Sequence, residues 1–168
     1  MDPKNKKRRR IRVANRSECV RCDPSEIRLA MRFVDKNSKH TIPDGELSIA
    51  VMDNREIAAI HARFMDDDSA TDVITFPGDA AEKFAGEICV SAEQAIISAE
   101  ELGKSLSSEI ALYLVHGWLH LAGFNDHTEQ DRKSMRKAEK EILDLIRDAG
   151  LHPRISTIEN TCPRQCAE

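Results

Sequence analysis

Two histidines four residues apart form the most chemically informative pattern in the chain. His116 and His120 stand at positions i and i+4, which share one face of a helix, so both imidazoles can reach one metal ion. Gly123 follows them, and glycine readily ends a helix in the left-handed conformation. The chain can then turn back to deliver a third ligand from Asp126 or His127. Three protein ligands leave a coordination position for water, as in catalytic rather than structural zinc sites.

Paired histidines also occur in packed cores, where they hydrogen-bond to the backbone. Here the surrounding residues favour a metal, because the segment is apolar on almost all sides and two imidazoles in a buried helix need a compensating partner. The apolar residues are Ile110, Leu112, Leu114, Val115, Leu119 and Leu121. We therefore predict one divalent metal ion, with zinc as the expected ion.

The spacing is similar to that of the zinc peptidases that carry H-E-x-x-H-x-x-G-x-x-H, with one difference. Gly117 stands where their glutamate acts as the general base. Glycine has no side chain to deprotonate water, so the sequence argues against a peptidase of that type. What remains is a metal-activated water or a metal Lewis acid with another substrate.

Length and composition predict a single cytoplasmic domain. The chain has 168 residues and 40% hydrophobic content, enough for one core. It has no apolar run of membrane-spanning length, and its N-terminus lacks the apolar stretch of a signal peptide. Five cysteines is an odd number, which fits a reducing compartment better than a disulfide framework.

Basic residues gather at the N-terminus of a chain whose formal net charge is -4. We expect residues 1–9 to form a flexible basic arm, which suggests attraction to phosphate, although a solvated tail explains the feature equally well. The arginines that we expect to contact RNA are Arg8, Arg9, Arg10 and, on a later helix, Arg55.

Strands and helices are expected to alternate through residues 10–151 and to position the histidines. Alternating apolar residues predict strands at about 11–13, 47–51, 71–76 and 86–91. Helical spacing and capping residues predict helices at about 23–34, 57–64, 91–103, 107–122 and 128–149. Residues 152–168 are expected to form a C-terminal tail.

Three motifs in this order resemble the YbeY family of metal-dependent endoribonucleases. They are T-D-V-I-T-F-P at 71–77, G-E-I-C-V-S at 86–91 and the segment from His116 to His127. The resemblance implies a single-domain α+β fold, with a mixed four-stranded sheet packed with about five helices and a zincin-like metal helix. It also implies a single-strand-specific endoribonuclease that matures ribosomal RNA, notably the 3′ end of the small-subunit RNA, and serves ribosome quality control. The implied partners are ribosomal RNA and the small ribosomal subunit, without a membrane or DNA.

The family's third histidine lies ten positions after the first, and this chain departs from that pattern. Asp126 occupies the position, and His127 comes one residue later. Matching without a gap also aligns Met135 and the last helix, and a carboxylate is an acceptable zinc ligand. We favour Asp126 as the third ligand, with His127 as the alternative.

A second departure concerns catalysis. Where the family often has Tyr-Arg-Gly before its T-D-V motif, this chain has Phe64-Met65-Asp66. The resemblance assigns catalysis to the metal centre with His116, and Arg63 on the same helix is our candidate to replace the missing arginine. The absence of that arginine also supports an alternative, a non-enzymatic ribosome-assembly factor that binds RNA and holds a structural metal.

Overall fold

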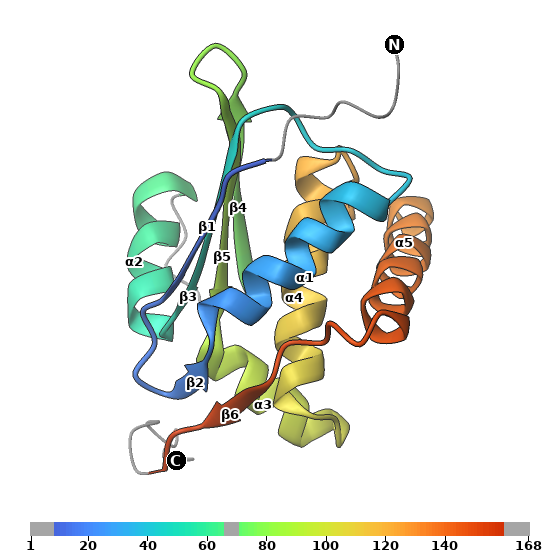
Figure 1. The fold of residues 1–168 in the computed structure, drawn as a ribbon. Coiled ribbons are helices and arrows are strands. Elements are labelled where there is room, and N and C mark those ends of the chain that lie inside the picture. Colours follow the sequence, from blue (N-terminus) through green and yellow to red (C-terminus); the bar gives the residue numbers. More distant parts are fainter. Residues whose placement is uncertain (1–8, 66–70, 160–168) are drawn as a thin grey trace.

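The computed structural model describes residues 9–65 and 71–159 (Figure 1). Within these ranges the chain forms the expected single α+β domain with five helices. The elements in chain order are β1 Ile11–Asn15, β2 Val20–Cys22, α1 Pro24–Asn37, β3 Glu46–Met52, α2 Asn54–Met65, β4 Val73–Asp79, β5 Phe84–Ser91, α3 Ala92–Leu102, α4 Leu106–Leu121, α5 Glu129–Asp148 and β6 Ile155–Thr157.

The main sheet is mixed and four-stranded, as predicted, with the order β1-β3-β5-β4. β1, β3 and β5 run parallel, while β4 pairs antiparallel with β5 at the sheet edge. We expected this strand to end at about residue 76, before Pro77, but it continues to Asp79. An edge strand tolerates proline because one side of its backbone needs no ladder partner.

Helices cover both faces of this sheet (Figure 1). α2 lies on one face, over a small cluster of buried residues that includes Ile57, Ile74 and Cys89. α1, α4 and α5 lie on the other face and enclose the main core, in which Trp118 and Leu119 of α4 are 0% exposed. α4 is therefore the buried helix that the sequence predicted.

Capping residues explain where the helices begin. Asp23 accepts from the Ser25 amide ahead of α1, and Ser91 accepts from the Gln94 amide ahead of α3. Thr128 and Asp131 form a reciprocal capping box at the start of α5.

Among the described helices, none has the length and apolar character that a membrane crossing requires.

The expected C-terminal tail begins with ordered structure, which corrects the boundary at residue 152. β6 pairs antiparallel with β2, placing Ile155 opposite Cys22 and Thr157 opposite Val20. Ile155 is buried, and Ser107 of α4 hydrogen-bonds its backbone. Burial and backbone pairing therefore extend the folded domain beyond residue 151.

Arg9 corrects the predicted basic arm. Its side chain is 4% exposed and its Nε donates to Asp35 at 3.0 Å. The same guanidinium donates to the carbonyls of Pro43 and Gly45, each at 2.7 Å. A guanidinium satisfied in this way is not available to RNA, because binding a phosphate would break these contacts. Arg8 lies outside the described residues.

Candidate metal centre

Helix α4 carries His116 and His120 and is held directly against the sheet. A Cβ atom added to Gly117 would lie 2.6 Å from Ile88 Cγ2 and 3.3 Å from Val73 Cγ2. The helix can approach the sheet this closely only because position 117 has no side chain. The glutamate of the zinc peptidases would therefore meet β5 at this position, which agrees with the sequence argument against that class.

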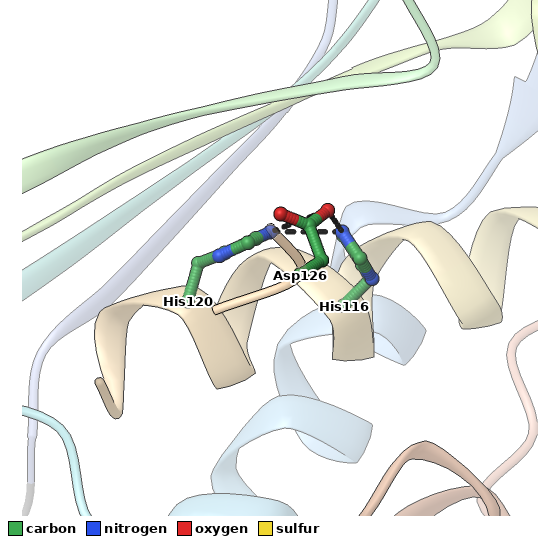
Figure 2. Close-up of side chains that lie close together, drawn as sticks. All are labelled: His116, His120 and Asp126. Carbon is green, nitrogen blue, oxygen red and sulfur yellow. Dashed lines mark hydrogen bonds and ion pairs between the residues drawn. The ribbon is translucent and has the colours of Figure 1, made fainter. Parts of the chain in front are cut away.

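The two imidazoles and a carboxylate converge at one point (Figure 2). His116 Nε2 and His120 Nε2 are 2.9 Å apart, and Asp126 Oδ2 lies 3.8 Å from each of them. One ligand atom from each residue falls within 4.8 Å of the others, so the three side chains could hold a metal ion. All three are partly buried, with 22%, 26% and 42% of their side-chain surface exposed.

The outer nitrogens of both rings have acceptors. His116 Nδ1 lies 2.7 Å from Glu139 Oε1, and His120 Nδ1 lies 3.0 Å from the Phe124 carbonyl oxygen. Because a carbonyl or carboxylate oxygen accepts, each Nδ1 carries a hydrogen, so the neutral form of each ring has its lone pair on Nε2. Two Nε2 atoms 2.9 Å apart beside a carboxylate can share a proton or, in its place, can bind a metal ion through their lone pairs. This second layer of acceptors is also typical of histidines that bind metals.

The pKa values of the two histidines move in opposite directions. Burial alone would lower the pKa of His116, but the hydrogen bond and charge of Glu139 outweigh it and the pKa is raised. The pKa of His120 is lowered, first by burial and then by the charge of His116. The two rings therefore hold one proton more readily than two, and a metal ion would bind in place of that proton.

The loop after α4 brings Asp126 to the histidines. Gly123 adopts a φ of +92°, and the Phe124 amide donates to the Leu119 carbonyl at 3.0 Å. Arg132 Nη1 then donates to the carbonyls of Asp126 at 3.2 Å and His127 at 3.0 Å. His127 is exposed and does not belong to the group of three converging side chains. The geometry therefore favours Asp126 as the third ligand.

A cavity of about 530 Å³ opens beside the three side chains. One wall is the edge strand β4, including Thr75 and Pro77, and the other is formed by α4 and the loop with Asn125. The donor set of two imidazole nitrogens and one carboxylate oxygen would suit zinc, and three such ligands would leave one coordination position for water or substrate. The arrangement fits a catalytic metal rather than a closed structural one.

The structure separates the other predicted site residues from this centre. Arg55 and Arg63 are exposed on α2, and neither lines the cavity. Arg10 is exposed near β1, at the opposite edge of the sheet from β4, and pairs with Glu46. His61 of α2, by contrast, lines the cavity.

Two residues of α5 contact the site although no sequence pattern identified them. Glu139 bonds the His116 ring, and Arg132 bonds the backbone of the loop with Asp126. The only signal for Glu139 is an acidic residue next to the buried positions Met135, Ala138 and Ile142. A carboxylate beside an apolar stripe often has a polar partner in the structure.

Comparisons with known proteins agree with this fold. The profile of the family described as Endoribonuclease YbeY matches residues 12–147. A protein of Carboxydothermus hydrogenoformans named Endoribonuclease YbeY is 30% identical over 136 residues, covering 80% of this chain and 95% of its own length. A protein of the same name from Mycolicibacterium smegmatis is 35% identical over 147 residues, covering 80% and 81%. The chain belongs to the YbeY family.

A solved structure supports the fold independently. The solution structure of a Thermotoga maritima protein superposes with a TM-score of 0.56 and covers 84% of this chain and 94% of its own. The two sequences are 23% identical, so this likeness concerns the arrangement of helices and strands alone.

Proposed function

We propose that this protein is an endoribonuclease that cleaves single-stranded RNA at the centre formed by His116, His120 and Asp126. The observation that carries the proposal is the convergence of two imidazole lone pairs and a carboxylate on the wall of an open cavity. Membership of a family whose relatives are named endoribonucleases supports the substrate class.

The cofactor in this proposal is one divalent metal ion, with zinc as the first expectation. His116, His120 and Asp126 would hold it, and a bound ion would supply Lewis acidity towards a phosphate oxygen and make nearby water more acidic. Glu139 keeps the hydrogen of His116 on Nδ1 and thereby presents the Nε2 lone pair. Thr75 and Asn125 line the same cavity and offer polar groups for the sugar and phosphate oxygens.

The catalytic roles that we propose belong to His116, through the metal centre, and to Arg63. Arg63 is exposed on α2 and does not itself line the cavity, although His61 of the same helix does. Its exposed position makes Arg63 a candidate for contacting substrate phosphate rather than for holding the metal.

The biological setting follows from the family resemblance. We propose a cytoplasmic enzyme that acts on ribosomal RNA at the small subunit, including maturation of the 3′ end of its RNA and ribosome quality control. DNA and membranes are not expected partners.

The alternative is a ribosome-assembly factor that binds RNA without cutting it and uses the metal as a structural tie. Its support is Met65 at the position of the family arginine. Purified zinc-loaded protein incubated with end-labelled single-stranded RNA separates the two. We expect cleavage that disappears on chelation and in His116→Ala, and that persists in the control His152→Ala. Cleavage that survives metal removal would refute the enzyme mechanism, and intact RNA throughout would favour the assembly factor.

A further inference from the structure

Helix α5 has opposite charge in its two halves. Residues 129–137 contain four basic and two acidic side chains, and residues 138–148 contain two basic and four acidic ones. Glu129 is shared by three cations in the first half, from Arg132 at 3.3 Å, Arg136 at 3.6 Å and Lys133 at 3.9 Å. One carboxylate cannot neutralise three cations, so a local excess of positive charge remains.

We call Arg132, Lys133 and Arg136 the basic face. Their side chains are 44%, 64% and 59% exposed, and their ion pairs with Glu129 are long, so each pair contributes little and is easily exchanged for another anion. In the second half, by contrast, Lys140 approaches Asp144 to 2.7 Å and Arg147 approaches it to 2.8 Å.

The basic face is connected to the metal centre through Arg132. Arg132 donates to the carbonyls of Asp126 and His127, two residues that line the cavity. Arg136 lies one turn further along the helix, and Glu139, which bonds His116, follows three residues later on the same side. Arg132 therefore contacts the loop that lines the cavity, Arg136 lies on the same side of α5 as Glu139, and Lys133 shares the Glu129 carboxylate with both. The N-terminal arginines Arg10 and Arg12 lie instead near β1, at the far edge of the sheet.

We propose that the basic face binds the phosphate backbone of the RNA strand next to the scissile bond, with Lys133 and Arg136 as its main contacts. The inference rests on the proposed function and names the surface that holds the substrate. Phosphate is the expected ligand because it is anionic, has several acceptor oxygens and recurs along the strand. Binding by the basic face would also hold the RNA strand in a protein that has Met65 at the position of the family arginine.

The test compares two double variants that each remove two positive charges from α5. Lys133→Ala/Arg136→Ala removes two of the three cations of the basic face and leaves Arg132 on its loop carbonyls, and Lys140→Ala/Arg147→Ala is the matched control in the other half. Zinc-loaded proteins are titrated into a fluorescent 2′-O-methyl single-stranded RNA, which carries the same phosphates and resists cleavage. Anisotropy at several salt concentrations gives Kd and its salt dependence, while zinc content and circular dichroism check the centre and the fold.

The basic-face variant should bind roughly tenfold more weakly, and its slope of log affinity against log salt should fall by about 1.4, the value for two lost phosphate contacts on a single strand. The control should stay within twofold. Glu129→Gln should bind more tightly than wild type, because it removes the anion that competes with phosphate. Equal binding by the two double variants would overturn the basic face as an RNA site.

These measurements also separate this inference from the proposed function. Wild type that binds the probe through Lys133 and Arg136 but leaves unmodified RNA intact would support the surface and refute the nuclease. Wild type that cleaves RNA while the basic-face variant binds as well as the control would refute only the surface. Wild type that does not bind the probe would overturn the surface.

Discussion

Helix α4 and the loop that follows it, residues 122–128, bring ligands to the same centre by different physical means. His116 and His120 stand on a helix whose neighbouring residues Trp118 and Leu119 are 0% exposed. Asp126 stands on the loop, with 42% of its side chain exposed. The helix ligands are thus positioned by the packing of the core, and the loop ligand by a few polar contacts.

Because of this difference, the two kinds of ligand convert unequal shares of their interaction with the ion into affinity. A side chain that is already in place needs little ordering, so most of its interaction with the ion appears as affinity. A side chain on an exposed loop must be fixed when the ion binds, and the loss of its freedom offsets part of the gain. We therefore expect the helix ligands to contribute more affinity than the loop ligand, and the outer contacts to contribute less than either.

The largest effect is expected from His116→Ala and His120→Ala. Each should weaken zinc binding by far more than the roughly 10–100-fold that the loss of an outer partner costs. Zinc at 100 times the wild-type Kd should raise the free energy of unfolding of the wild-type protein by about 2.7 kcal/mol. The same zinc concentration should leave the free energy of unfolding of either variant almost unchanged. Titration calorimetry and thermal unfolding with buffered zinc measure both quantities.

His152→Ala is the control for these variants, because it removes an imidazole outside the cavity. It should keep wild-type zinc affinity. If His116→Ala or His120→Ala kept it as well, the ion would bind elsewhere and α4 would not supply its ligands.

The next effect tests which loop residue is the ligand. Asp126→Ala should weaken zinc binding at least about 100-fold but less than either helix variant, because it removes a coordinating oxygen. His127→Ala should remain within a few fold of wild type, since its side chain stands outside the converging group. Chelator competition at equal ionic strength ranks the two. The reverse ranking would transfer the role to His127.

A smaller effect is expected from Glu139, which supports a helix ligand from α5. Glu139→Ala removes the acceptor 2.7 Å from His116 Nδ1 and should weaken zinc binding about 10–100-fold. Glu139→Gln should recover part of the loss, because its amide oxygen can still accept from Nδ1. Asp144→Asn removes a charge elsewhere on α5 and should leave zinc binding unchanged. Equal affinity of Glu139→Ala and wild type would mean that the core alone orients His116.

The sequence predicted the parts of the molecule that repeat a period. The spacing of His116 and His120 with apolar neighbours placed α4 within one residue of its ends, 106–121 rather than 107–122. The capping pattern at Thr128 likewise predicted the start of α5. Such patterns are readable because each turn of a helix repeats the same packing requirement.

Contacts between distant residues were not readable in this way. β2 and β6 have three residues each, too few to display a period, and they pair across more than 130 positions. Arg9 looked like part of a solvated charge run, yet its partner Asp35 lies 26 residues away. Glu139 is 23 residues from His116, so its role depends on how α5 packs against α4.

The smallest effect on zinc affinity is expected from Arg132, which contacts the backbone of the loop. Arg132→Ala removes two hydrogen bonds to the carbonyls of Asp126 and His127, each worth about 0.5–1.5 kcal/mol and here at the lower end because Arg132 is 44% exposed. With about 1.4 kcal/mol for each tenfold change, zinc affinity should fall about threefold to tenfold in the absence of RNA. Loss of a nearby positive charge would by itself strengthen cation binding, so a weaker affinity reports the loop contacts. Arg136→Ala removes the same charge from the basic face without touching those carbonyls, and should leave zinc affinity equal or slightly higher. If Arg132→Ala behaved like Arg136→Ala, the loop would hold Asp126 through its glycine turn and capping box alone.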